Sequence, residues 1–167
     1  MDWRGTIALM NLGLLSACSP AAPAAVAPTL FDDLTRAGAC YARTYDSAHL
    51  TAHPRQTVTH FFVGEAGPGW RPTQSPQHFN VAFGFHIVGH SDTYAGVGIC
   101  APNGETVACD IEADGGSFTI ARNSDGLRVT AMRIQVEGAH DFSPDLAEAD
   151  NRVMLLRPAA AQECAAA

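Results

Sequence analysis

A run of alternating side chains at residues 79–88 constrains the fold of this chain more than any other feature. Large apolar residues occupy every second position, and smaller or polar residues lie between most of them. The large residues are Phe79, Val81, Phe83, Phe85 and Ile87. A period of two is the repeat of a β-strand, so the run predicts a strand with one face turned to a core.

Turn residues separate the strand-like runs that follow. Asn103-Gly104, Gly115-Gly116 and Ser124-Asp125-Gly126 are of the types that favour tight turns. The pattern predicts an antiparallel meander. Its strands are expected at 40–45, 56–63, 79–88, 94–101, 106–113, 117–122, 127–137 and 152–157.

Helices play a small part in this prediction. Short helices are expected at 29–38 and from Ser143-Pro144 to 149, and Asp46 can cap a single turn through Leu50. Because closure removes exposed strand edges, an all-β barrel of about eight strands with two short helices is favoured over a sandwich.

Residues 1–17 have the layout of a secretory signal peptide. An apolar stretch from Ile7 to Leu15 follows the positive charge of Arg4. It is shorter than the roughly 20 residues that span a bilayer, which favours a signal peptide over a transmembrane helix. Leu15-Ser16-Ala17-Cys18 resembles the lipobox of bacterial lipoproteins. The resemblance implies cleavage before Cys18 and attachment of fatty acyl chains such as palmitate to that residue.

The residues after Cys18 indicate where the protein is held. Ser19 favours an outer-membrane anchor facing the periplasm, with the inner membrane as the alternative. Residues 18–29 are rich in Ala and Pro, which is typical of an extended tether of about 3 Å per residue. The β domain is then expected to span residues 30–167.

Four further cysteines, at 40, 100, 109 and 164, are expected to form two disulfides in an oxidising compartment. If Gly104-Glu105 is the centre of the intervening turn, Cys100 lies directly opposite Cys109. If Asn103-Gly104 is the centre, the two are diagonal neighbours. Cys40 and Cys164 would then clamp the ends of the domain. The alternatives are free thiols or a zinc site built from all four cysteines, although no C-x-x-C spacing supports the zinc site.

His49 and His53 have the i,i+4 spacing of helical metal ligands, and Asp46 is a candidate third ligand. The alternative is a polar loop whose Asp and His side chains cap backbone groups. Asp110, Glu112 and Asp114 resemble the opening of a calcium loop, but its twelfth position is Ala121 rather than Glu. No motif indicates a cofactor or a catalytic nucleophile.

Trp70 lies in a loop rich in Gly and Pro and is the candidate ligand-binding residue. The alternative, which a lone aromatic residue favours, is that it plugs one end of the barrel. The formal net charge is −7 and no run of arginines is present, which excludes a typical nucleic-acid binder.

The run from Cys40 to Gln56, taken with the later cysteines, resembles small exported proteins of Gram-negative bacteria that have no assigned function. The resemblance implies a self-contained exported module and carries over no catalytic residue. We therefore expect a non-enzymatic envelope protein that binds a partner protein, a cell-wall component or a small ligand. The alternatives are a metal-binding protein or hydrolase that uses Asp46, His49 and His53, and a purely structural envelope protein.

Overall fold

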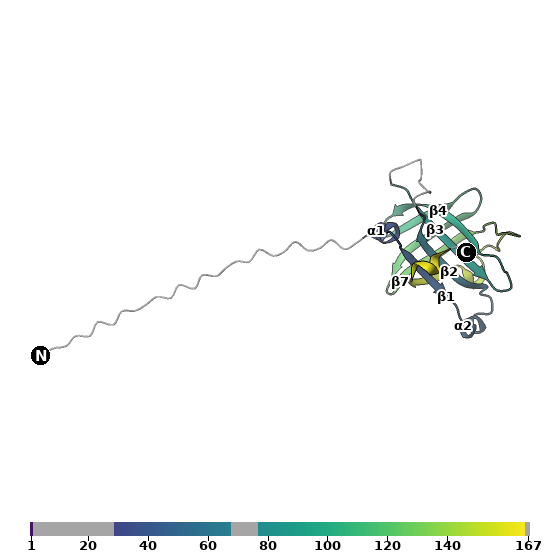
Figure 1. The fold of residues 1–167 in the computed structure, drawn as a ribbon, viewed down its shortest axis with the longest axis horizontal. Helices are drawn as coiled ribbons and strands as arrows, with labels where there is room; N and C mark the ends of the chain where they lie inside the picture. The colour runs from purple at the N-terminus through teal and green to yellow at the C-terminus, as the bar shows by residue number, and fades with distance from the viewer. Residues whose placement is uncertain (2–28, 68–76, 166–167) are drawn as a thin grey trace.

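Eight strands form one closed antiparallel barrel in the computed structural model, which describes Met1 and residues 29–67 and 77–165 (Figure 1). Each strand pairs with the next along the chain, and the last pairs with the first. The strands are β1 (Cys40–Thr44), β2 (Val58–Glu65), β3 (Phe79–Ile87), β4 (Tyr94–Asn103), β5 (Thr106–Ile111), β6 (Gly116–Asn123), β7 (Gly126–Ile134) and β8 (Val153–Pro158). The predicted all-β barrel is confirmed.

The described helices are short. They are α1 (Leu30–Thr35), α2 (Ser47–Ala52) and the 3₁₀ turns η1 (Ala149–Asn151) and η2 (Ala161–Cys164). Thr29 and Asp32 form a reciprocal capping box at the start of α1, which buries Leu30 and Leu34 against the core. Among the described residues, none of the helices combines the length and the apolar character needed to cross a membrane.

The helix expected from Ser143-Pro144 to residue 149 is wrong. This segment instead pairs with the end of β7, because the backbone N–H of Ser143 donates to Val136 and that of Leu146 donates to Ile134. The carboxylate of Asp145 accepts from the backbone N–H of Ile134 and of Ala147. Tertiary hydrogen bonds and the complete burial of Leu146 therefore override a sequence that favours helix initiation.

Apolar side chains from every described strand fill the barrel interior. The alternating residues of 79–87 are all buried, as the period of two predicts. Gly96 and Gly98 leave room for the rings, since an added Cβ at these positions would lie 2.9 Å from Phe83 and from Phe118. An eight-stranded barrel has just enough interior space for its own side chains. The place to look for a binding site is therefore the wall and the rims.

Both disulfides have the expected pairing. Cys100 lies directly opposite Cys109 with Gly104-Glu105 at the centre of the turn, and the two Cα atoms are 4.0 Å apart. Cys40 and Cys164 join η2 to β1 with a Cα separation of 5.8 Å. The first bridge lies inside the barrel, whereas the second holds the C-terminal segment against its outer surface.

Two residues singled out in the sequence, Cys18 and Trp70, lie outside the described residues. The same is true of the predicted signal peptide after Met1 and of the tether through residue 28.

Replacing Cys40 and Cys164 together with alanine should destabilise the barrel, because the bridge closes a loop between residues separated by 124 positions. The loop-entropy model puts the loss in free energy of unfolding at up to about 5 kcal/mol. Denaturant unfolding of the oxidised protein measures it. The matched pair, Cys100→Ala with Cys109→Ala, should lose about 3 kcal/mol of loop entropy together with some core packing. An unchanged unfolding midpoint in the first pair would show that the clamp does not constrain the unfolded chain.

Candidate functional site

The barrel wall is weakest where β1 meets β8. Only two residue pairs, Tyr41↔Pro158 and Ala42↔Arg157, join these strands, compared with five between β1 and β2. Past Ala42, side chains rather than a backbone ladder occupy the space between the two strands. We call this region the seam.

A pocket of about 330 Å³ opens at the seam. The end of β1, helix α2, turn η1 and the start of β8 surround it. Its lining residues are Arg43, Tyr45, His49, His53, Gln56, Ala149, Asp150, Arg152, Val153 and Leu155. Specific small-molecule sites begin at about this size, so the seam pocket is large enough for a fragment-sized ligand.

Tyr45 fills part of the seam. Burial raises the pKa of its hydroxyl, and the guanidinium of Arg43 and the backbone N–H of Leu155 oppose that rise. The guanidinium carbon of Arg43 lies 5.4 Å from the centre of the Tyr45 ring. This distance is within the range of a cation–π contact, so the two side chains together form one wall of the pocket.

Helix α2 adds His49 to this wall, and its C-cap residue adds His53. Asp46 caps the helix by accepting a hydrogen bond from the backbone N–H of His49. The ring centre of His49 lies 4.8 Å from that of Tyr45 and 4.4 Å from that of His53. Nε2 of His49 lies 2.9 Å from the side-chain oxygen of Gln56, which fixes the imidazole between its neighbours.

The fold thus brings together His49 and His53 of the predicted metal trio, but it uses Asp46 as a helix cap. In the described part of the chain, no three His, Cys, Asp or Glu side chains are grouped to hold a metal ion, and this applies also to Asp110, Glu112 and Asp114. For Asp46, the hydrogen bond to the backbone N–H of His49 supports the alternative that it caps a backbone group.

Turn η1 forms the opposite rim of the pocket and is firmly attached. The side-chain oxygen of buried Asn151 accepts from the backbone N–H of Thr57 and of Val58, and its amide donates to the hydroxyl of Thr57. Arg55 pairs with Asp150 at 3.0 Å, which neutralises the carboxylate on the rim. These hydrogen bonds therefore hold the η1 rim of the pocket against the start of β2.

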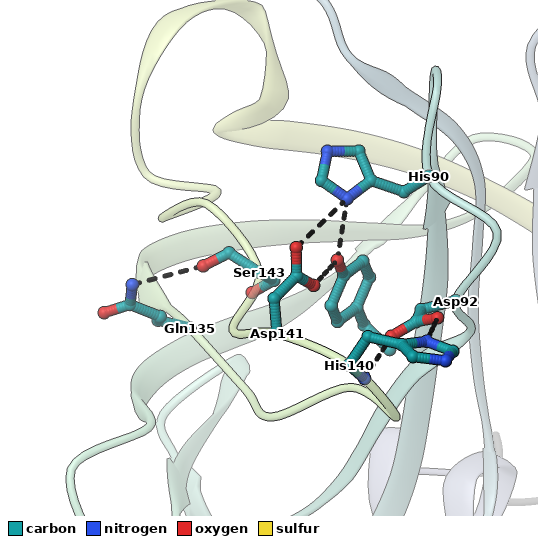
Figure 2. A network of polar contacts seen from close by, with 7 residues as sticks. His90, Asp92, Gln135, His140, Asp141 and Ser143 are labelled. Carbon is teal, nitrogen blue, oxygen red and sulfur yellow. Dashed lines mark hydrogen bonds and ion pairs between the residues drawn. The ribbon is translucent and has the colours of Figure 1, made fainter.

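A second polar group, which we call the loop cluster, lies where residues 138–143 meet the turn between β3 and β4 (Figure 2). The carboxylate of Asp92 accepts from the backbone N–H of His140 at 2.8 Å and lies 2.6 Å from Nδ1 of its ring. The Tyr94 hydroxyl donates to Asp141 at 2.6 Å and lies 2.9 Å from Nδ1 of His90. These contacts fasten one loop to the other.

The charges in the loop cluster perturb one another. The hydrogen bond to Asp92 raises the pKa of His140, and the hydrogen bonds from His140 lower the pKa of Asp92. Burial, assisted by Asp141, raises the pKa of Tyr94 to about 12. The tyrosine is therefore a neutral hydrogen-bond donor at any physiological pH.

The Asp92–His140 pair has the geometry of an oriented general base, since Nδ1 faces the carboxylate and the His140 side chain is 78% exposed. Among the described residues, no Ser, Thr or Cys side chain forms a hydrogen bond with His140. The contacts of the pair fasten residues 138–143 to the turn between β3 and β4. The sequence did not predict this cluster. Its only sequence signals are His90 with Asp92 and the adjacent pair His140-Asp141, and nothing in the sequence links the first pair to the second.

Fold and pocket define the class to which this protein belongs: an up-and-down barrel of eight described strands with a pocket at its closing seam. No family model, curated protein or solved structure matches the chain.

Replacing Asp92 with asparagine should lower the pKa of His140 toward the ordinary value of 6.5. A histidine whose pKa is higher in the folded than in the unfolded state stabilises the fold. This contribution is complete at pH values below the unfolded-state pKa and is lost as the pH rises through the folded-state pKa. A carboxyl with a lowered pKa, here below 3.8, contributes above its unfolded pKa and stops as the pH falls through the folded one. The stability lost in the variant should therefore be greatest between about pH 4 and 6.5.

Proton NMR titration of the His140 ring and denaturant unfolding across this pH range measure both effects. Asp114→Asn, at an exposed turn position, is the matched control and should alter neither. A His140 pKa that does not move in Asp92→Asn would contradict the assignment.

Proposed function

We propose that the protein is an exported, lipid-anchored binding module of the bacterial envelope, which takes its ligand at the seam pocket. The lipobox-like residues that end at Cys18 support the anchor. The disulfides at Cys40–Cys164 and Cys100–Cys109 suit an oxidising compartment such as the periplasm. The expected tether, twelve residues at about 3 Å each, would hold the barrel up to about 36 Å from the membrane surface.

The observation that carries the binding role is the composition of the seam pocket. Val153 and Leu155 are 47% and 48% exposed there, beside the guanidinium groups of Arg43 and Arg152. Apolar side chains in a concave site with a few charged groups are typical of ligand recognition.

The alternative role, a metal-binding protein or hydrolase that uses Asp46, His49 and His53, stays a prediction of the sequence alone. Asp46 is engaged at the start of α2, and His49 and His53, whose rings stack on each other, line the pocket. We therefore assign these two histidines to the binding surface.

Changing Cys18 to serine should abolish lipidation, because only a thiol can form the thioether. Metabolic labelling with palmitate and membrane fractionation of the producing cells measure the change. The wild-type chain should carry label, begin at residue 18 and remain with the outer membrane. The Cys40→Ser and Cys164→Ser pair is the control, since it should keep the label. A mature protein that retained the first seventeen residues would contradict the anchor.

A photo-activatable residue in place of Leu155 should capture the ligand inside the living envelope. The control is the same residue in place of Met132, which is 54% exposed on β7 and does not line the seam pocket. Mass spectrometry of the purified protein should show an adduct at position 155 and none at position 132. The same adducts at both positions, or none at 155, would remove the support for a binding pocket at the seam.

A further inference from the structure

Four planar side chains follow one another along one wall of the seam pocket. The guanidinium of Arg43 stacks on the ring of Tyr45, that ring lies against His49, and His49 stacks on His53. Successive groups are 5.4, 4.8 and 4.4 Å apart. Because the inner groups cover one another's faces, the wall offers the pocket its ring edges and, at its end, the exposed ring of His53. A further flat ring can pack on this surface edge-to-face or by offset stacking.

The wall that β8 contributes to the pocket is aliphatic. Val153 and Leu155 project from β8, and about half of each side chain is exposed. A flat apolar group between the two walls would cover both side chains and the stacked rings at once. A small polar anion would leave this apolar surface in water.

The charge of the pocket is the reverse of that of the whole chain. The protein carries a net charge of −7, yet Arg43 and Arg152 line the pocket and its one carboxylate, Asp150, is paired with Arg55. Within the described residues, no acceptor is placed on the guanidinium of Arg152. A guanidinium binds carboxylates in a planar, two-pronged geometry, so the pocket is suited to a ligand with a carboxylate.

The available space limits the size of that ligand. The seam pocket measures about 330 Å³, and a second hollow of about 130 Å³ adjoins it at Arg43 and Leu155. This volume suits one or two fused rings and is too small for a folded partner domain.

From these features we propose that the seam pocket binds a small aromatic carboxylate. Its ring system packs between the stacked wall and Leu155, and its carboxylate pairs with Arg152 and Arg43. This assignment rests on the proposed function, in which the seam pocket is the binding site, and names the class of ligand.

Calorimetric titration of the purified, oxidised full chain tests it with four probes. These are 2-naphthoate, 2-naphthylmethanol (the ring without the charge), cyclohexanecarboxylate (the charge without the flat ring) and inorganic phosphate. The dissociation constant for 2-naphthoate should be at least about tenfold lower than for any other probe, because one charge-assisted hydrogen bond alone is worth about that factor.

Variants locate the two parts of the interaction. Arg152→Gln should weaken 2-naphthoate binding about tenfold and leave 2-naphthylmethanol unchanged, since only the carboxylate contact is lost. Arg36→Gln, at the end of α1 and outside the pocket lining, is the matched control and should change neither. His53→Ala should weaken both naphthyl probes, because it removes a stacking face.

Two results would overturn the ligand class: equal affinity for 2-naphthoate and cyclohexanecarboxylate, or equal weakening by Arg152→Gln and Arg36→Gln. An adduct at position 155 in the photo-capture experiment, combined with no binding of 2-naphthoate, would overturn the ligand class while leaving the pocket in place. If there were neither an adduct at position 155 nor binding of 2-naphthoate, the proposed function would be overturned as well.

Discussion

Ring closure between β1 and β8 is the interaction on which the rest of this architecture depends. A meander leaves two open edges unless its first and last strands meet, and here they meet through two residue pairs. The chain beyond β8 continues across the outer face of β1 and β2, where Nε2 of His60 lies 3.0 Å from the carbonyl of Glu163 and Cys164 is bonded to Cys40. A covalent clamp thus performs part of the closure that hydrogen bonds perform elsewhere in the ring.

The short closure also creates the candidate site. Where the strands separate, Tyr45 and Arg43 occupy the space that a backbone ladder would fill, and α2 lies beside them with its histidines. The site is therefore a local replacement of main-chain pairing by side chains, which explains why planar, cationic and aliphatic groups occur together. The barrel interior, filled by its own apolar residues, serves as the rigid support for this surface.

Features that depend on neighbouring residues could be predicted from the sequence, and features that depend on distant ones could not. The alternation of apolar residues with a period of two predicted the strand at 79–88. The turn residues around Gly104 limited the pairing register of Cys100 and Cys109 to two possibilities. Local signals misled at Ser143, because contacts with the end of β7 outweigh its tendency to start a helix. The pairing of Asp92 with His140 joins residues 48 apart and carries no sequence pattern. The seam pocket could not be predicted either, because its lining residues come from distant parts of the chain. The sequence indicated only the i,i+4 spacing of His49 and His53.

The position of the Cys100–Cys109 bridge sets an order on oxidative maturation. Both residues are almost fully enclosed, at 0% and 1% exposed, so no oxidant or isomerase can reach their sulfurs once the strands surround them. Thiol–disulfide exchange needs direct access for the attacking sulfur. The bond must therefore form while this hairpin is still open to the solvent. The Cys40–Cys164 bond has no such limit, because it lies on the outer surface of the barrel and Cys164 is only partly buried.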